Sequence, residues 1–327
     1  MTICQIPVSS GITEINSSQR PVYSVLFAKD GKLVSGGVDG TLRLWRVDDG
    51  HEICEPIRTG GEQIYAAALS HDRKWLACGL QPLNLNDGKA YVRVWDTQTQ
   101  EKVLDIKGHT NSVFSVDFSP DSTKILTGSA DKQAFIWSMT TGKPLVGPLD
   151  HEGYVVAVRF SPNGDRIATA TAENPDPKSI RIYNSENGQL LLDIPFTVKN
   201  YVTSKLAWSA DGHQLFAAAF SEAKRFDTSS GSLLGKWSVP GGGSSAPIVI
   251  SRNSKFIAVA AFKSVSLWDT STQEQIGTAI KHTSAVRSIA LSPDDACIAT
   301  GEENGKVTLR SLRETIPLSY FTVDVSD

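Results

Sequence analysis

Residues 108–137 read GHTNSVFSVDFSPDSTKILTGSADKQAFIW, and this stretch decides the fold. Two runs of β-type residues, 113–116 and 124–128, lie on either side of the tetrapeptide Phe118-Ser119-Pro120-Asp121. Alternating apolar residues favour strands, and Ser, Pro and Asp favour the tight turn that joins two strands. The stretch therefore predicts a β-hairpin.

The turn motif recurs through the whole chain. Each copy has an apolar anchor, then Ser (Ala28 in the first copy), and then Asp or Asn two residues later. Successive anchors are 42, 49, 42, 48, 42 and 41 residues apart, and regular spacing of this length indicates repeated structural units. The seven anchors are Phe27, Leu69, Phe118, Phe160, Trp208, Ile250 and Leu291.

A second periodic position lies further along each unit. In five units it falls 18 or 19 residues after the anchor, at Trp45, Trp137, Phe226, Trp268 and Arg310; Trp95 and Tyr183 follow their anchors by 26 and 23 residues. Alternating residues before this position predict a third strand, and a fourth β-type run such as 102–106 follows. Four short strands per unit, repeated seven times, predict one all-β domain over residues 1–327, a seven-bladed β-propeller with four antiparallel strands per blade.

Composition limits the class of function. The chain has 327 residues, 40% of them hydrophobic and 20% charged, as in ordinary globular proteins. Lys and Arg total 32 against 35 Asp and Glu, without a dense basic run, so we expect no nucleic-acid partner. The longest apolar run, 256–262, is far short of the roughly 20 residues that span a bilayer, so we expect no membrane partner.

The cysteines and the first residues bear on the compartment. Cys4, Cys54, Cys78 and Cys297 form no Cys-x-x-Cys pair, so we expect reduced thiols, no metal and no cofactor. Residues 1–11 do not have the pattern of a secretory signal. We therefore expect a cytoplasmic protein, with the nucleus as the alternative, and a monomer when it is on its own.

Short motifs identify a family resemblance. Trp95-Asp96 and Trp268-Asp269 are Trp-Asp dipeptides, and Gly108-His109 is a Gly-His pair nine residues before its anchor Phe118. His151 and His282 stand at the same distance before their own anchors. With these motifs in phase, the chain resembles the WD40-repeat β-propellers along essentially its whole length. The resemblance implies a propeller that serves as a protein-interaction platform.

The resemblance also implies a structural hydrogen-bond tetrad in the third unit. Its members are His109, a strand hydroxyl (Thr127 or Ser129, of which we favour Ser129), Asp131 and Trp137. We interpret the His and Asp pair as structural rather than as a catalytic acid and base, because such a set satisfies polar groups that are costly to bury. The last unit departs from the pattern, with Asn304 and Arg310 in place of Asp and Trp.

Two segments compete to close the ring. Residues 12–15 align without a gap on 103–106, since Ile15 and Ile106 both lie twelve residues before their anchors. The C-terminal segment 318–324 lies at an outer-strand distance from Arg310. We favour the N-terminal segment as the outer strand of the last blade, with the C-terminal tail packed nearby.

One position in phase indicates a binding site. Four residues before each anchor, near the start of the innermost strand, the mouth of a central channel is expected, and the residues there are Tyr23, Tyr65, Phe114, Val156, Ser204, Ala246 and Arg287. Three aromatics on consecutive blades, with an Arg across the seam, are residue types enriched at binding hot spots. We favour peptide docking at Tyr23, Tyr65, Phe114 and Arg287, and interblade packing is the alternative.

The longer loops are expected on the same face. Residues 80–88 and 172–178 are insertions, and the glycines 241–243 form a linker. No Gly-rich phosphate loop, His-Glu-x-x-His helix or nucleophile elbow is present, so we predict no enzyme. We predict a non-catalytic scaffold that docks a peptide or protein loop on this face. The alternatives are a small-ligand binder, for example for a sugar, a propeller enzyme with a channel site, or a sensor module of a larger signalling assembly.

Overall fold

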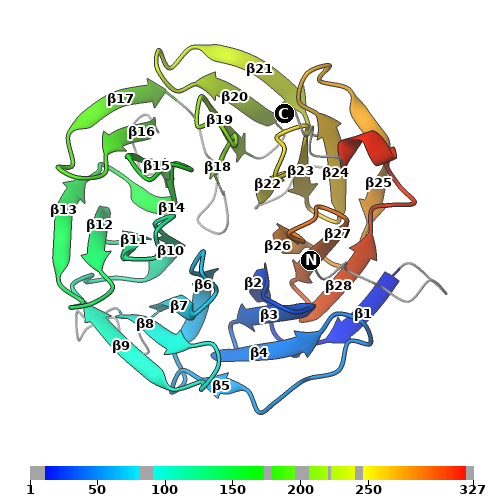
Figure 1. Cartoon of the computed structure of the whole chain (residues 1–327), viewed down its shortest axis with the longest axis horizontal. Coiled ribbons are helices and arrows are strands. Elements are labelled where there is room, and N and C mark those ends of the chain that lie inside the picture. Colours follow the sequence, from blue (N-terminus) through cyan, green and yellow to red (C-terminus); the bar gives the residue numbers. More distant parts are fainter. Residues whose placement is uncertain are drawn as a thin grey trace.

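Seven four-stranded antiparallel sheets, here called blades, stand around a central axis (Figure 1). The computed structural model describes residues 12–81, 91–172, 179–195, 206–219, 222–239 and 246–321. Blades 1 to 3 consist of β2 (Val22–Phe27), β3 (Lys32–Gly37), β4 (Thr41–Arg46) and β5 (Ile57–Arg58); β6 (Gln63–Leu69), β7 (Trp75–Gln81), β8 (Tyr91–Asp96) and β9 (Lys102–Lys107); and β10 (Val113–Phe118), β11 (Lys124–Ser129), β12 (Gln133–Ser138) and β13 (Pro144–Asp150).

The remaining blades continue the same order from the channel outward. They consist of β14 (Tyr154–Phe160), β15 (Arg166–Ala172), β16 (Ser179–Asn184) and β17 (Leu190–Pro195); β18 (Leu206–Trp208), β19 (Gln214–Ala219), β20 (Glu222–Asp227) and β21 (Leu233–Ser238); β22 (Ile248–Ile250), β23 (Phe256–Ala261), β24 (Ser264–Asp269) and β25 (Gln275–Lys281); and β26 (Val286–Leu291), β27 (Cys297–Glu302), β28 (Lys306–Ser311) and β1 (Ile12–Asn16). The predicted seven-bladed β-propeller is confirmed.

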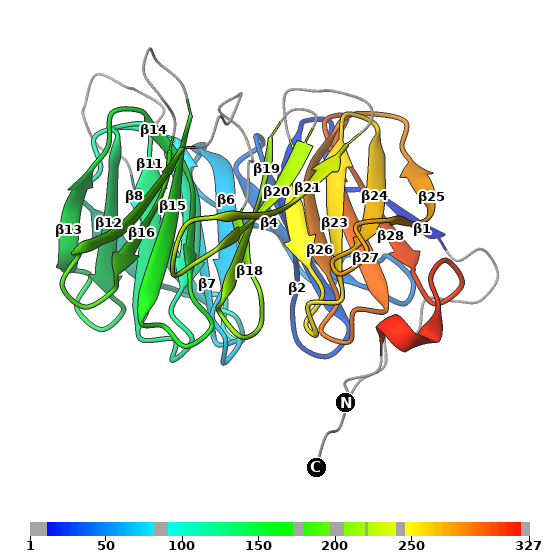
Figure 2. The ribbon, with the colours of Figure 1, turned by 90° about the horizontal axis from the view of Figure 1, so that it is seen from above.

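The N-terminal segment is the strand that closes the ring. β1 pairs antiparallel with β28, from Ile12 opposite Arg310 to Asn16 opposite Lys306. Lys306 Nζ lies 2.8 Å from Glu14 Oε2, and Ile15 is buried in the core between blades 7 and 1. In the competing C-terminal segment, residues 318–320 form instead a short 3-10 helix, η2 (Leu318–Tyr320), at the lower edge of the ring in Figure 2. Residues 322–324 of that segment lie outside the described residues.

The turn motif has a direct physical role. In blade 3 the Ser119 hydroxyl donates to Asp121 Oδ1 at 2.5 Å and accepts from the Lys124 amide at 2.9 Å. These bonds satisfy backbone and side-chain groups within the turn, as Ser and Asp commonly do. The same Ser-to-Asp or Ser-to-Asn bond is present in blades 2 to 7, at Ser70, Ser119, Ser161, Ser209, Ser251 and Ser292. In blade 1, Ala28 has no hydroxyl to make it.

Apolar clusters fill the spaces between neighbouring blades. Close packing requires glycine where one blade meets the next: a Cβ on Gly128 of β11 would lie 2.6 Å from Val155 Cγ1 of β14.

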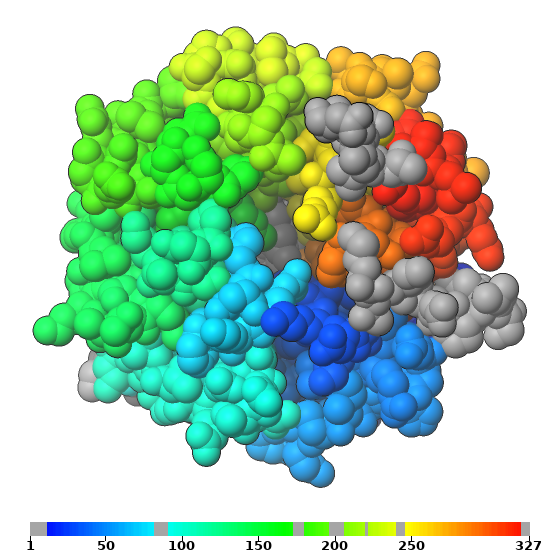
Figure 3. All heavy atoms as spheres, in the orientation of Figure 1, coloured from blue at the N-terminus to red at the C-terminus, as the bar shows by residue number. Residues whose placement is uncertain are grey.

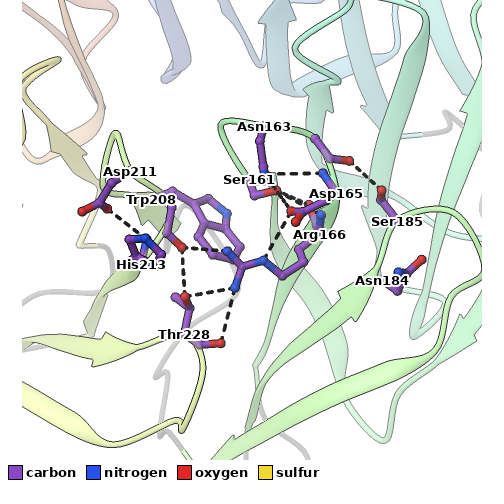
Figure 4. A network of polar contacts seen from close by, with 12 residues as sticks. Ser161, Asn163, Asp165, Arg166, Asn184, Ser185, Trp208, Asp211, His213 and Thr228 are labelled. Carbon is purple, nitrogen blue, oxygen red and sulfur yellow. Dashed lines mark hydrogen bonds and ion pairs between the residues drawn. The ribbon is translucent and has the colours of Figure 1, made fainter.

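Polar contacts also cross between blades, as Figure 4 shows for blades 4 and 5. Arg166 Nη2 donates to the Gly212 carbonyl at 2.9 Å, and its guanidinium lies over the Trp208 ring. The blades therefore form one continuous packed ring.

The structure also bears on two expectations from the sequence, the membrane partner and the long loops. Among the described residues, no helix is long and apolar enough to cross a membrane. The loop segments 82–90 and 173–178, the linker 241–243 and Ser204 lie outside the described residues.

Candidate docking site at the channel mouth

A β-bulge places the predicted side chains at the mouth of the channel. In five inner strands the pairing register shifts at the position four residues before the anchor, which leaves one extra residue in the strand. A bulge bends the strand and re-aims the extra side chain, and bulges are frequent next to functional sites. The five extra residues are Tyr23, Tyr65, Phe114, Val156 and Arg287.

Three aromatic rings at this position, together with Tyr154 at the start of β14, contact one another across four blades. The Tyr23 and Tyr65 rings are stacked, with centroids 5.1 Å apart and planes at 11°. Phe114 meets Tyr65 edge-on at 5.4 Å, and Tyr154 meets Phe114 edge-on at 6.5 Å. All four side chains are half-buried, and they are called the aromatic ladder below.

Sequence reasoning missed Tyr154, because it lies at the start of β14, two residues before the position read in phase. That position holds Val156, which is buried. The signal in the sequence was the aromatic at the first residue of the strand. In blade 6 the residue four positions before the anchor is Ala246, which is buried and has no aromatic side chain.

An ion pair lies at the Tyr23 end of the aromatic ladder. Arg287 Nη2 is 2.5 Å from Glu303 Oε2, and the Glu303 side chain is 47% exposed. Burial raises the pKa of the Tyr23 hydroxyl; the charge of Arg287 lowers it and that of Glu303 raises it. Arg287 thus lies close enough to Tyr23 to affect its hydroxyl, and its charge is neutralised by Glu303, a residue that the sequence analysis did not single out.

The geometry decides what can bind. Since Tyr23 and Tyr65 cover one another's faces, no cation fits between them. The cavity beneath the rings is about 20 Å³, far below the several hundred Å³ of a typical small-molecule pocket. The aromatic ladder is therefore a surface that side chains of a partner can contact, with an exposed carboxylate beside it.

The tetrad of blade 3 forms around one hydroxyl. His109 Nε2 lies 2.7 Å from Thr127 Oγ1, and Trp137 Nε1 donates to the same oxygen at 2.8 Å. His109 Nδ1 lies 2.8 Å from Asp131 Oδ2. The expectation of Ser129 is wrong, because the hydroxyl between His109 and Trp137 is that of Thr127. Ser129 Oγ instead donates to the Asn111 carbonyl and accepts from the Asp131 amide.

The buried charges of this tetrad stabilise the fold. Burial raises the pKa of Asp131, but hydrogen bonds and charge from His109 outweigh burial and lower it. Both side chains of the pair are almost fully buried, with exposed fractions of 2% and 4%. A pair without access to solvent or to a pocket cannot exchange protons with a substrate, so its effect is on stability.

Other blades build the same network from different residues. In blade 1, where the sequence has no His, Ser17 Oγ takes its place and lies 2.8 Å from Ser35 Oγ, which accepts from Trp45 Nε1. In blade 4, His151 Nε2 lies 2.9 Å from Thr169 Oγ1 and 3.2 Å from the Tyr183 hydroxyl. These replacements keep the buried groups hydrogen-bonded.

Blade 7 departs from the pattern in a way that the sequence analysis did not anticipate. His282 Nδ1 lies 3.2 Å from Glu302 Oε1, a buried carboxylate, whereas Asn304 is exposed. Thr308 Oγ1 donates to the same Glu302 oxygen at 3.0 Å. Glu302, two residues before Asn304 in the chain, therefore acts as the acidic member in this blade.

A second opening lies at the lower end of the channel, on the face drawn in Figure 3, which is hollowed at its centre. The cavity there is about 640 Å³ and includes Asp117 and Arg159, whose charged groups are 3.5 Å apart. Burial raises the pKa of Asp117. Among the described residues, no group of three or more His, Cys, Asp or Glu is placed to hold a metal ion.

Comparisons with known proteins agree with this architecture. The family model "WD domain, G-beta repeat" matches residues 11–46, 100–138, 143–184 and 273–310. The chain is 33% identical over 122 residues to the target of rapamycin complex subunit wat1 of Schizosaccharomyces pombe, covering 36% of this chain and 34% of that protein.

Two longer relatives match a similar share of the chain. The protein groucho of Drosophila melanogaster is 28% identical over 137 residues, which is 40% of this chain and 18% of groucho. Periodic tryptophan protein 2 of Saccharomyces cerevisiae is 27% identical over 127 residues, 38% of this chain and 13% of that protein. The matches thus span about a third or less of each relative. With seven four-stranded blades and repeat matches from residue 11 to residue 310, the chain belongs to the WD40-repeat family of β-propellers.

Proposed function

We propose that the protein is a non-catalytic interaction scaffold that docks a peptide or a loop of a partner protein on the aromatic ladder. One observation carries the proposal: five inner strands bulge at the same position, and three of the re-aimed side chains are adjoining aromatic rings. Rigid aromatic rings on a fixed scaffold bind with little loss of conformational entropy. The name of the wat1 relative, a complex subunit, supports a protein partner.

The exposed Glu303 carboxylate indicates the chemistry of the docked segment. It lies beside Tyr23, at the end of the ladder where the Arg287 charge is already neutralised. We propose that the segment places an apolar side chain against Tyr65 and Phe114 and an N–H or O–H donor next to the exposed Glu303 carboxylate, whose charge Arg287 already balances. A polar rim contact of this kind contributes to specificity more than to affinity.

The test replaces one ring of the ladder. Tyr65→Ala should weaken partner binding about thirtyfold, corresponding to about 2 kcal/mol, because Tyr65 contacts rings on both sides. Partners captured from a lysate of the native source would be identified with the wild type, and their affinities would then be measured by calorimetry. Tyr91→Ala, a half-buried tyrosine on the third strand of the same blade, is the matched control and should bind like wild type. Equal affinity for Tyr65→Ala and wild type would place docking elsewhere.

The lower cavity supports a second candidate function, binding of a charged small ligand. The Asp117 and Arg159 groups there could contact both an ammonium or hydroxyl group and an anion of one molecule. Stabilisation by small metabolites in a thermal-shift assay, lost in Asp117→Asn, would favour this function over protein docking. A shift that persists in the variant would exclude Asp117 from the site.

We also propose that the protein acts as a monomer in the cytoplasm, with the nucleus as the alternative, and without nucleic acid. Cys54, Cys78 and Cys297 are free thiols, which suits a reducing compartment. The greater length of the relatives keeps open a role as one module of a larger assembly.

A further inference from the structure

The C-terminal segment 312–321 shows how this ring covers an apolar groove between two blades. It leaves β28 and packs across the outer part of blades 6 and 7, with Leu312 and Ile316 buried in the cluster that contains Val265 and Ile280. The Tyr320 hydroxyl donates to Asp269 Oδ2 at 2.7 Å. The groove between blades 6 and 7 is therefore occupied by the protein's own chain.

The equivalent groove between blades 1 and 2 is open. The strand registers define the equivalence: Leu42 of β4 lies opposite Ile57 of β5, as Val265 of β24 lies opposite Ile280 of β25. Leu42 and Ile57 line a groove of about 500 Å³ that also includes Leu44 and Leu69. No segment of the described chain fills it.

The short outer strand explains the opening. β5 has two residues, whereas β25 has seven. Leu44 and Ile57 are consequently half-buried, while their counterparts Leu267 and Ile280 are buried. Apolar side chains left partly exposed in a concave site are a common feature of binding surfaces.

The rim of the groove carries a positive charge. Five of its eight charged residues are basic, and they are Lys29, Lys32, Arg43, Arg73 and Lys74; the acidic ones are Asp30, Glu55 and Asp96. Arg43 is paired with Glu52 at 3.0 Å and Lys74 with Asp72 at 3.9 Å, but neither Lys29 nor Lys32 makes an ion pair with any residue that the structure describes. An acidic segment would supply the missing partners.

We propose that the groove between blades 1 and 2 binds an extended segment of a partner protein, in which an aliphatic side chain is flanked by Asp or Glu. The aliphatic side chain lies against Leu42, Leu44 and Ile57, as Ile316 does in its own groove, and the acidic residues pair with Lys29 and Lys32. The groove opens on the lower face, at the turns that follow the inner strands, whereas the aromatic ladder lies where those strands begin. The two sites can therefore be occupied independently.

The experiment finds the ligand by selection from random peptides, so the partner protein need not be identified first. A library of displayed twelve-residue random peptides would be selected on the wild-type protein and counter-selected on Leu44→Glu. We expect a consensus with one aliphatic residue between acidic ones. The synthetic consensus peptide should bind the double variant Lys29→Glu, Lys32→Glu at least tenfold more weakly than wild type, with the difference shrinking as salt is raised.

Two controls keep the result decisive. The double variant changes rim residues only, so circular dichroism should show a native fold even if Leu44→Glu is unstable. Lys132→Glu, Lys143→Glu on blade 3 makes the same charge change far from the groove and should bind like wild type. Tyr65→Ala should also bind like wild type, which separates this site from the aromatic ladder.

Other outcomes would overturn the proposal. A consensus that is basic, or that binds the double variant as well as wild type, would exclude an acidic segment in this groove. Failure of the selection to yield any peptide dependent on Leu44 would exclude a peptide site there. Concentration-dependent dimerisation in sedimentation, abolished by the double variant, would assign the groove to a second copy of the chain.

Discussion

At the scale of single residues, the Thr127 hydroxyl joins two buried groups. It contacts His109 Nε2 and accepts from Trp137 Nε1, and both rings are buried. A hydroxyl can donate one hydrogen bond while it accepts another, which a methyl group cannot do. The residue at position 127 therefore decides whether the buried ring nitrogens of His109 and Trp137 have a hydrogen-bond partner.

Thr127→Val should lower the free energy of unfolding by about 3 kcal/mol, because it keeps the side-chain shape and leaves both ring nitrogens without a partner. Ser129→Ala, which removes the other candidate hydroxyl, should cost about 1 kcal/mol, since it breaks only bonds to backbone. Urea unfolding of both variants measures the difference. An equal loss in the two variants would contradict a central role for Thr127.

His151 makes stability depend on pH. Its Nδ1 donates to the Leu149 carbonyl, and burial lowers its pKa to about 4. Below its ordinary pKa of about 6.5 the unfolded chain takes up a proton that the folded protein resists, so this contribution is present at neutral pH and is lost as pH falls towards 4. The contribution is up to about 3 kcal/mol.

The measurement compares wild type with His151→Gln by urea unfolding between pH 4.5 and pH 7.5. We expect the free energy of unfolding to fall more steeply with acid in wild type than in the variant, because the variant has no group to protonate at this site. Parallel curves would show that His151 titrates alike in the folded and unfolded protein.

At the scale of elements, the sequence predicted the turns and strands because their signals are local. In blades 2 to 7 the Ser-to-Asp or Ser-to-Asn bond of the turn joins residues two positions apart, and the alternation of each strand can be read directly from the sequence. Tyr154, Ser17 and Glu302 were missed because their roles depend on a bulge or on a neighbour brought in by tertiary packing. We compared only the residue four positions before each anchor, so Tyr154, which lies six positions before its anchor, was not considered.

The closing strand offers a test at this scale. Ile15→Glu should lower the melting temperature by several degrees and promote aggregation, because it places a charge in the core and detaches β1 from the edge of β28. Ile12→Glu, on the same strand but exposed, is the matched control and should behave like wild type. Differential scanning fluorimetry and light scattering measure the two effects. Similar behaviour of the two variants would mean that β1 contributes little to the ring.

At the scale of the whole molecule, stability is distributed unevenly around the ring. The inner strand β22 has three residues, against six in β10 and seven in β14. In blade 6 the buried Trp268 indole nitrogen has no hydrogen-bond partner among the described residues, because Val259 stands where blade 3 has Thr127. Blade 6 therefore has fewer stabilising hydrogen bonds than blade 3.

Hydrogen exchange should reveal this difference. Amides of β22 are expected to exchange at least tenfold faster than those of β10 and β14, since local opening costs less where fewer bonds hold a strand. Mass spectrometry of peptides from each blade measures the rates under native conditions. Uniform protection around the ring would show that the blades open as a single cooperative unit.

The sequence predicted the number of blades, the family and three rings of the candidate site, but not the open groove between blades 1 and 2. The groove depends on β5 being two residues long, and the sequence between Val47 and Pro56 gives no periodic signal that separates a short strand from a regular one. The open groove becomes evident only by comparison with blade 6, where Leu312 and Ile316 of the C-terminal segment cover the equivalent groove.

The pairing of β1 with β28 also has a consequence for biosynthesis. Glu14 and Lys306 are 292 positions apart, so β1 is translated long before β28, the strand with which it pairs. Blades 1 to 6 can assemble in order as they emerge, because each consists of consecutive strands. During that interval β1 is an unpaired strand, open to capture by a chaperone or by a neighbouring nascent chain. Translation rate, and not only sequence, therefore bears on how much closed ring the cell obtains.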